Sequence, residues 1–259
     1  MLDRVQGFVF DLDGCVWNGN VLNPGAADVL ARLVRRGRRL AFLTNNSRAT
    51  AAEILARLQA LGVTVAEHAL TPLEIIGQVI AQRFGRSRVL VVGARDLVDA
   101  IAREGHEIVP IEDYHRATVA AVGNDFDLTY ERLTAASRVA AATGRLVTPN
   151  VDPRLPIEDG AFLPGCGAII AAVAAAAGVT PIVVGKPEPP LFEIALARLG
   201  LRAEVTAMVG DSVAADIRGG RAVGMRTVLY APGEPPSPPP PEADLTIRSF
   251  AELAALAGV

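Results

Sequence analysis

The sequence predicts an α/β fold built on a mostly parallel sheet with helices on both faces. Apolar runs of strand length alternate with segments of helical periodicity along the 259 residues. The strand-length runs are nearly continuous in apolar residues, as expected of strands buried on both faces. The predicted strands are 8–13, 40–46, 88–93, 118–123, 181–185, 207–211 and 226–230.

Two early helices carry clear end signals. Segment 23–37 has apolar residues on one helical face and ends at Gly37. Segment 50–62 begins at Thr50, a good N-cap residue, and Glu53 lies three residues on, which completes a capping box. Both helices follow a predicted strand, so each fits a strand–helix–strand unit.

Composition excludes several function classes. About half of the residues are apolar, which is ample for a sizeable core, and the net charge of −3 gives no support for nucleic-acid binding. No uncharged apolar run is long enough to span a membrane, and the first residues lack a secretion-signal pattern. We therefore expect a cytoplasmic protein without nucleic-acid or membrane partners.

Cysteine and histidine usage does not indicate a soft metal site. Cys15 and Cys166 stand alone without a C-x-x-C spacing, so we expect reduced thiols and no disulfide. His68, His106 and His115 are well separated in polar segments, and we expect them on the surface.

Four of the predicted strands end in polar residues, at 11–13, 44–47, 185–186 and 210–211. Ligands of open parallel sheets bind outside the carboxyl ends of the strands. These four strand ends are therefore the expected site.

The first strand end carries two acids, Asp11 and Asp13, followed by Gly14. Side chains two residues apart on an extended chain point the same way, so both carboxylates can face one cation or substrate, and the glycine permits a tight turn. An ordinary surface turn of the D-x-D-G type is the alternative for this motif by itself.

The next two strand ends supply donors and a cation. Thr44, Asn45 and Asn46, followed by Ser47, offer hydroxyl, amide and backbone N–H groups suited to phosphate oxygens, or they cap the next helix. Lys186 places a compact positive charge at the third strand end, unless it is an ordinary solvated lysine.

The fourth strand end adds Asp211, with Asp216 about one helical turn further on. Carboxylates gathered without a cation repel one another and raise their pKa values. A hard divalent ion relieves this repulsion, and an all-oxygen ligand set favours Mg²⁺ over Zn²⁺.

The segments DLDGCVW, TNNS, GKPEPP and GDSVAAD occur in this order and resemble the four motifs of the haloacid dehalogenase (HAD) superfamily of phosphatases. The resemblance implies a Rossmann-like parallel-sheet core formed by 1–85 and 181–259. The gap of about 140 residues between the second and third motifs is similar to the class with an inserted C2-type α/β cap domain, here 86–180.

The resemblance implies a role for each motif residue. Asp11 would be the nucleophile that forms an aspartyl-phosphate, and Asp13 the general acid and base. Lys186 would stabilise developing charge, and Thr44 with the Asn45 amide would hold the phosphoryl group, with Asn46 beside them.

The resemblance also implies a Mg²⁺ site. Its ligands would be the Asp11 carboxylate, the Asp13 carbonyl and Asp211, with Asp216 in support. Ser212 departs from the Arg or Asn that relatives often carry there, and we expect local retuning without loss of the metal.

The segments LVTPNVDPRLPIEDGAFLPGCGAI and GKPEPPLFEIALARLGL are similar to those of the NagD-like or 4-nitrophenylphosphatase subfamily. This resemblance implies that the substrate is a small phosphorylated metabolite of the phosphoglycolate or glycerol-3-phosphate type. Asn150, Asp152 and Arg154, in loop 148–156, are the candidate specificity residues, unless the loop is only a proline-stiffened turn. Leu155 lies near the place where pyridoxal-phosphate specialists carry a histidine, which argues against that substrate.

Two other functions remain compatible with the sequence. The same fold supports phosphotransferases and mutases, and a non-catalytic phosphate-binding regulator uses similar acids, Thr and Lys, although such receivers are shorter and lack a cap. Homodimer formation is also open. The proline-rich segment 235–241 is expected to form an exposed stiff loop.

Overall fold

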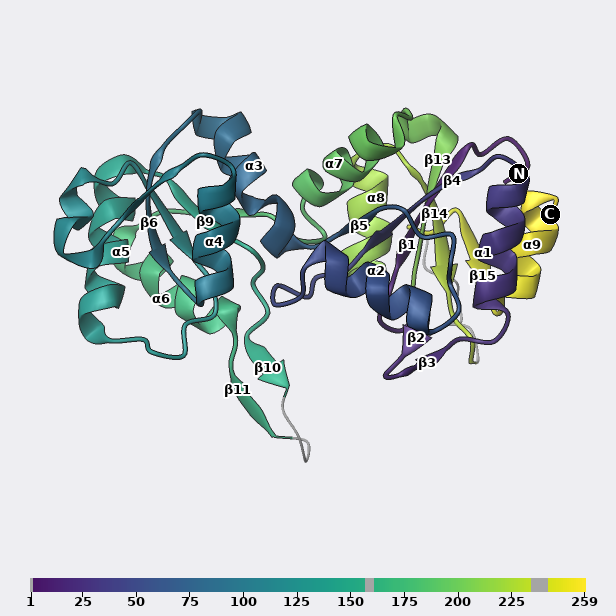
Figure 1. Ribbon diagram of the computed structural model, residues 1–259, viewed down its shortest axis with the longest axis horizontal. Coiled ribbons are helices and arrows are strands. Elements are labelled where there is room, and N and C mark those ends of the chain that lie inside the picture. The colour runs from purple at the N-terminus through teal and green to yellow at the C-terminus, as the bar shows by residue number, and fades with distance from the viewer. Residues whose placement is uncertain (1, 157–160, 234–241) are drawn as a thin grey trace. The chain divides into compact units, whose positions relative to one another are not determined.

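The computed structural model describes residues 2–156, 161–233 and 242–259, so the proline-rich loop predicted at 235–241 lies outside the described residues (Figure 1). The chain forms two compact units. Unit 1 comprises Met1–Thr44, Ala49–Thr71 and Lys186–Val259, and unit 2 comprises Asn45–Arg48 and Pro72–Gly185. The predicted cap, 86–180, begins later than the main segment of unit 2, because helix α3 (Pro72–Phe84) packs against α4 (Arg95–Arg103) of unit 2.

Unit 1 is built on a six-stranded parallel sheet in the order β15-β14-β13-β1-β4-β5, as the sequence predicts for the fold class. The order reverses between β1 and β13, because the chain first moves outward from β1 to β4 and β5 and later returns to the other side of β1. The strands are β1 (Gly7–Asp11), β4 (Arg39–Leu43), β5 (Ala69–Leu70), β13 (Thr206–Gly210), β14 (Arg226–Tyr230) and β15 (Leu245–Ile247).

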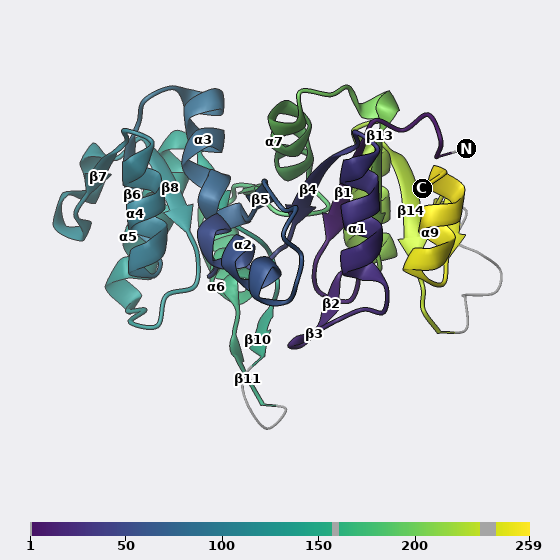
Figure 2. The ribbon, with the colours of Figure 1, turned by 45° about the vertical axis from the view of Figure 1, so that its right-hand side comes forward.

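Helices cover both faces of the unit 1 sheet. One face packs an aromatic cluster that includes Phe8, Phe10, Phe42 and Phe250 against the helices α1, α2 and α9. The other face is covered by α7 and α8, which pack together, and Figure 2 shows α7 beside β4. The helices are α1 (Ala26–Arg35), α2 (Ala51–Ala60), α7 (Pro189–Leu199), α8 (Arg218–Ala222) and α9 (Phe250–Ala257), with a 3₁₀ turn at Ala203–Val205 and a π-helical turn at Val213–Ile217.

The end signals read from the sequence are confirmed in α1 and α2. Gly37 lies two residues after α1 with φ of +75°, a conformation that few residues other than glycine adopt. Thr50 caps α2 by accepting from the Glu53 backbone N–H, and the Glu53 side chain accepts from the Thr50 backbone N–H. This reciprocal capping box fixes where α2 begins.

Unit 2 is built on a five-stranded parallel sheet in the order β12-β9-β8-β6-β7. The order reverses between β6 and β8. Helices α5 and α6 pack together over one face of this sheet, and α4 packs against α3. The strands of this sheet are β6 (Arg88–Val92), β7 (Glu107–Val109), β8 (Val119–Val122), β9 (Leu146–Thr148) and β12 (Ile182–Val183). Unit 2 also contains α5 (Tyr130–Thr143), α6 (Cys166–Ala177) and a 3₁₀ helix at Ile111–Arg116.

Two short antiparallel hairpins complete the described structure. In unit 1, β2 (Trp17–Asn18) pairs with β3 (Val21–Leu22) directly after the first motif. In unit 2, β10 (Arg154–Pro156) pairs with β11 (Phe162–Pro164). None of the helices that the structure describes is long and apolar enough to cross a membrane.

The expectation that all three histidines lie on the surface is wrong for His106. This side chain is only 5% exposed, and its Nδ1 accepts the Ser87 backbone N–H at 3.1 Å while Nε2 lies 2.9 Å from the Gly77 carbonyl. The ring therefore links α3 to the residue before β6. The polar residues around His106 in the sequence suggest exposure, but both ring nitrogens have hydrogen-bond partners inside the protein, which allows the imidazole to be buried. Cys15 and Cys166 are buried free thiols.

Candidate active site

The strand-order reversal of unit 1 brings the first, third and fourth predicted motifs together, and Thr44 of the second motif is hydrogen-bonded to Asp13 of the first. Asp11 is the last residue of β1, Asp211 follows β13, and Lys186 lies three residues before α7. Since β1 and β13 are paired neighbours, their carboxyl ends meet at one edge of the sheet. This is the place where open parallel sheets hold their ligands.

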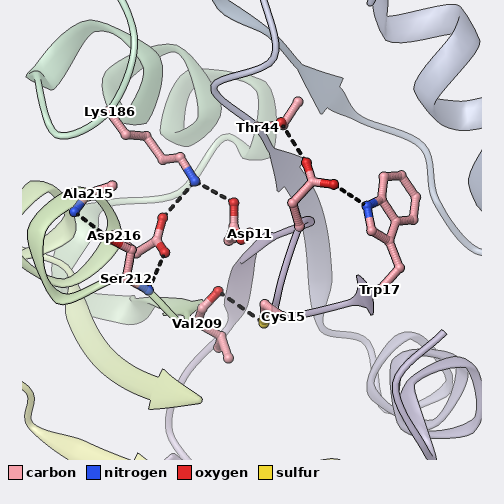
Figure 3. Close-up of polar contacts among 10 residues, drawn as sticks. Asp11, Cys15, Trp17, Thr44, Lys186, Val209, Ser212, Ala215 and Asp216 are labelled. Carbon is pink, nitrogen blue, oxygen red and sulfur yellow. Dashed lines mark hydrogen bonds and ion pairs between the residues drawn. The ribbon is translucent and has the colours of Figure 1, made fainter. Parts of the chain in front are cut away.

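Lys186 lies between two carboxylates (Figure 3). Its Nζ is 2.5 Å from Asp11 Oδ1 and 2.6 Å from Asp216 Oδ1. All three side chains are at most 7% exposed. The lysine is therefore a buried, paired charge, and the alternative of an ordinary solvated lysine is excluded.

Asp13 lies in a different environment from Asp11, although only Leu12 separates them. Its side chain is exposed, and its two oxygens accept hydrogen bonds from Trp17 Nε1 at 2.8 Å and from Thr44 Oγ1 at 3.3 Å. These two donors come from the hairpin after β1 and from the end of β4. They fix the direction of the Asp13 carboxylate while leaving it open to solvent.

Two glycines allow the acids to lie directly against the backbone. A Cβ on Gly14 would lie 2.1 Å from Asp211 Oδ2, and a Cβ on Gly210 would lie 2.3 Å from Asp216 Oδ2. Gly14 also has φ of +90°, which disfavours any other residue. The tight turn inferred from the sequence is thus present, and it also provides the space in which the Asp211 carboxylate lies.

Ser212 holds the second acidic segment in place. Its Oγ accepts the Ala215 N–H at 3.1 Å and so caps the turn Val213–Ile217. Its own backbone N–H donates to Asp216 Oδ2 at 3.0 Å. Both oxygens of Asp216 are therefore bonded to the protein, one to Lys186 and one to Ser212.

The charges of the site shift its pKa values in a consistent way. Burial raises the pKa of Asp11 to about 7, and the nearby Lys186 ammonium offsets only part of this effect. Burial would lower the pKa of Lys186, but the carboxylates of Asp216 and Asp11 outweigh it and hold that pKa above its ordinary value. Burial and then the charge of Asp216 raise the pKa of Asp211. The cluster is therefore short of positive charge.

The chemistry of this cluster fits a hard divalent cation. Oxygen atoms of Asp11, Asp211 and Asp216 all lie within 4.8 Å of one another. With Lys186 as the one ammonium bonded into this cluster among the described residues, three carboxylates leave a formal charge of −2. A divalent ion balances that charge, and carboxylate oxygens without His or Cys suit Mg²⁺.

The remaining predicted site residues belong to unit 2. Asn150 is buried, its Nδ2 donates to the Asn45 carbonyl at 3.1 Å and to Ser47 Oγ at 3.2 Å, and its Oδ1 accepts the Asp152 N–H. It therefore links the loop 45–48 to the loop after β9.

Asn46 and the two other predicted specificity residues are set by local contacts in unit 2. The Asn46 Oδ1 accepts the Arg48 N–H at 3.0 Å. Asp152 and Arg154 are exposed, and the Arg154 guanidinium lies 4.3 Å from the centre of the Phe162 ring. Within unit 2, the side chains of Asp152 and Arg154 are thus accessible, whereas the Asn150 amide is buried and hydrogen-bonded to loop 45–48.

Sequence reasoning missed Trp17 and the packing role of Gly210. Trp17 ends the first motif, four residues after Asp13, and a polar indole N–H near a strand-end acid was the available signal. Nothing in the local sequence indicates that Asp216 returns to pack on Gly210, because that contact depends on the turn Val213–Ile217.

Comparison with known proteins agrees with this geometry. A family model described as haloacid dehalogenase-like hydrolase matches residues 8–107, and one described as HAD-hydrolase-like matches 183–253. Chronophin from Mus musculus is 34% identical over 243 residues, which cover 90% of this chain and 83% of that protein. Glycerol-3-phosphate phosphatase from Homo sapiens is 33% identical and covers 90% of this chain and 81% of that protein.

Solved structures give the same result. The crystal structure of a 4-nitrophenylphosphatase from Thermotoga maritima superposes with a TM-score of 0.85 at 29% identity, and it covers 99% of this chain and 98% of that chain. The chain belongs to the haloacid dehalogenase-like hydrolase family. Its function is that of a phosphatase, a hydrolase of phosphoric monoesters.

Proposed function

We propose that this protein is a Mg²⁺-dependent phosphatase that hydrolyses small phosphorylated metabolites through an aspartyl-phosphate on Asp11. The observation that supports it most directly is the contrast between two acids of one motif. Asp11 is buried and bonded to Lys186, whereas Asp13 is exposed and directed by Trp17 and Thr44. Two carboxylates in separate environments are suited to two separate roles.

The first half-reaction uses Asp11 as the nucleophile. A carboxylate oxygen of Asp11 forms a bond to phosphorus as the ester P–O bond breaks, and Asp13 gives its proton to the leaving oxygen. Lys186, at 2.5 Å from Asp11, provides positive charge where negative charge develops.

The second half-reaction reverses the role of Asp13. It takes a proton from a water molecule as that water attacks the phosphorus, and the Asp11–phosphorus bond breaks with return of the carboxylate. The Trp17 and Thr44 hydrogen bonds keep Asp13 in one orientation for both proton transfers. Thr44, at 2% exposed, is also our candidate for binding the phosphoryl group.

We propose that Mg²⁺ is held by the carboxylates of Asp11 and Asp211 and by the backbone carbonyl of Asp13. When bound, it supplies Lewis-acid charge for the phosphoryl oxygens. Asp216 supports the site by holding Lys186 and by accepting the Ser212 N–H, since both of its oxygens are engaged.

The substrate class rests on the relatives. One relative is named for glycerol-3-phosphate and one for 4-nitrophenyl phosphate, so we propose small monoesters of the glycerol-3-phosphate or phosphoglycolate type, with 4-nitrophenyl phosphate as an artificial substrate. Contacts from Asn45, Asn46, Asp152 and Arg154 to a substrate, and the closing of unit 2 as a cap, stay predictions. Location in the cytoplasm is part of the proposal, supported by two free thiols, and a homodimer stays open.

The test is a panel of phosphorylated metabolites assayed for inorganic phosphate and for the dephosphorylated product. We expect equal amounts of both with Mg²⁺ and neither after chelation. A phosphotransferase or mutase would give a new phosphorylated product without matching phosphate release. Absence of phosphate release from every ester in the panel would contradict the proposed function.

A further inference from the structure

A second concave site lies at the amino end of strand β4, within unit 1. It is a pocket of about 250 Å³ lined by Arg38, Arg39 and Arg198, with Glu67 and His68 beside them. Its apolar wall includes Val34 and Val65. None of these residues takes part in the candidate active site.

The charges of this pocket are not balanced by the protein. Three guanidinium groups stand against one carboxylate, that of Glu67, although the whole chain has a net charge of −3. Among the residues that the structure describes, no ion pair involves any of these arginines or Glu67. A basic residue in the last turn of a helix interacts favourably with the negative end of the helix dipole. That effect accounts for Arg198 at the end of α7 but not for all three arginines.

Two of the arginines are held in place by backbone carbonyls. Arg39 Nη1 donates to the Leu199 carbonyl, and Arg38 Nη2 donates to the Asp3 carbonyl at 2.7 Å. Each bond uses one of the five N–H donors of a guanidinium. The Nε of Arg38 is buried and has no hydrogen-bond partner in the described part of the chain. The groups are thus positioned by the fold while donors remain for a ligand.

We propose that this pocket binds a small organic phosphate, with its dianionic head on Arg38, Arg39 and Arg198 and its carbon part on Val34 and Val65. Guanidinium groups present planar paired donors that match phosphate oxygens. The volume is below the range of about 300–1,000 Å³ usual for drug-sized ligands, so the expected ligand is smaller than a nucleotide.

The pocket is separate from the catalytic end of the sheet. Arg39 begins β4 and Thr44 follows its last residue, and a strand rises about 3.3 Å per residue, which places the two ends roughly 16 Å apart. One small molecule cannot occupy both places. The inference therefore does not depend on the proposed chemistry of Asp11.

The test uses phenylphosphonate and methylphosphonate, whose C–P bonds are not open to ester hydrolysis. Their binding to the full-length, metal-free protein is measured by calorimetry for the unchanged protein, for Arg198→Ala and for Arg35→Ala. Arg35 is an exposed arginine near the end of α1 that does not line the pocket, so it is a control of equal charge change.

We expect Arg198→Ala to weaken phenylphosphonate binding about tenfold or more, the order of loss for a hydrogen bond to a charged group. Arg35→Ala should change it by less than about threefold, in line with a surface charge. Both variants should keep the kcat/KM of the unchanged protein with Mg²⁺, because neither touches the acidic site. Equal affinities in the two variants would overturn the proposal.

Two further readouts locate the ligand. Phenylglyoxal labels accessible arginines, and phenylphosphonate should protect the peptides with Arg39 and Arg198 but not the one with Arg35. Protection of all three alike would overturn the site. Methylphosphonate should bind more weakly than phenylphosphonate, and equal binding would overturn the role of the apolar wall. A change of oligomeric state in Arg198→Ala without phosphonate binding would assign the arginines to a protein interface instead.

Discussion

The sheets of unit 1 and unit 2 both reverse their strand order once, but they differ in the side chains that lie at the carboxyl ends of their strands. Both are parallel and helix-covered, and in each the strand order reverses once near the middle, at β1/β13 and at β6/β8. In unit 1, the carboxylates of Asp211 and Asp216 lie against Gly14 and Gly210 at that edge.

In unit 2, the same position is filled by an apolar side chain. A Cβ on Gly93 or on Gly123, which follow β6 and β8, would lie 2.7 Å from Leu97 Cδ2. Glycines therefore allow a side chain to pack closely at both reversals, but in unit 2 that side chain is the leucine Leu97 and in unit 1 it is a carboxylate. Topology provides the location, and the side chains that pack there decide whether it can support chemistry.

Among the variants that test this difference between the two sheets, Asp11→Asn should cause the largest loss of activity, because it removes the proposed nucleophile at the edge of the unit 1 sheet. Asparagine keeps the shape and a contact for Lys186 but cannot form the phosphoenzyme. We expect a loss of roughly 10⁴-fold or more in kcat, a magnitude typical of removing a nucleophile. Rapid-quench labelling with a ³²P-labelled substrate should find no labelled enzyme. Label on Asp11→Asn would show that the nucleophile lies elsewhere.

Asp13→Asn should fail in a different way. An asparagine oxygen can still accept the Trp17 N–H, and the backbone carbonyl stays, so only proton transfer is lost. Such a loss is typically about 10²–10⁴-fold. The first half-reaction should suffer less with 4-nitrophenyl phosphate than with an alkyl phosphate, because 4-nitrophenolate leaves without a proton.

Rapid-quench labelling of Asp13→Asn should then accumulate a phosphoenzyme, since the base for its hydrolysis is missing. Identical behaviour of the two substrates, or of the Asp11 and Asp13 variants, would contradict the division of roles between the acids.

The paired variants Gly14→Ala and Gly123→Ala compare the two edges directly. Alanine at Gly14 adds a Cβ 2.1 Å from Asp211 Oδ2 at φ of +90°, so the carboxylate must move. We expect about 10–100-fold weaker Mg²⁺ activation, the usual cost of disturbing the support of a metal ligand. Alanine at Gly123 meets the flexible end of Leu97. It should lower the free energy of unfolding by about 1–3 kcal/mol and leave Mg²⁺ activation unchanged.

The measurements for this pair are the Mg²⁺ dependence of kcat/KM and the melting temperature of each variant. Similar Mg²⁺ dependence in both variants would mean that Asp211 does not take part in metal binding.

The last expected effect is on stability, because the pH dependence of unfolding distinguishes the charged edge of the unit 1 sheet from the apolar edge of the unit 2 sheet. The pKa of Asp11 is about 7 in the folded protein against 3.8 unfolded, so the folded state binds more protons between these values. Its contribution to stability is complete below about pH 4 and is lost as pH rises toward 7. One pKa unit corresponds to about 1.4 kcal/mol.

Chemical unfolding of metal-free protein across pH 4–8 tests this expectation. Asp11→Asn should become more stable than the unchanged protein as pH rises, and Mg²⁺ should narrow the difference by stabilising only the unchanged protein. A difference that does not vary with pH would contradict the raised pKa of Asp11.

The sequence was sufficient for the elements whose signals are local. Apolar runs located β1, β4, β6, β8, β12, β13 and β14. Thr50 with Glu53 fixed the start of α2, because capping depends on a few neighbouring residues. Several other short strands were not predicted. β5 has two residues and β7, β9 and β15 have three each, and at this length pairing with an existing sheet decides the conformation more than periodicity does.

The site was predictable in its members but not in its pairings. Motif order singled out Asp11, Lys186, Asp211 and Asp216, which the structure brings together. That Lys186 is buried between two acids follows from burial and charge balance across segments 175 residues apart, which no local pattern encodes. Removing it would leave two buried carboxylates uncompensated, so a stability cost of about 3–5 kcal/mol should accompany the loss of activity.

The division of the chain between the units has a consequence for recombination among relatives. The chain crosses from one unit to the other at four peptide bonds: 44–45, 48–49, 71–72 and 185–186. Two of these crossings fall inside the second and third motifs, between Thr44 and Asn45 and between Gly185 and Lys186. A chimera that exchanges only Pro72–Gly185 would leave the donor's own 45–48 loop behind, and the Asn150 hydrogen bond to the Ser47 side chain would then depend on the residue that the recipient carries there. Exchange of unit 2 as a working module therefore requires that Asn45–Arg48 and Pro72–Gly185 come from the same parent, although 23 residues of unit 1 lie between them.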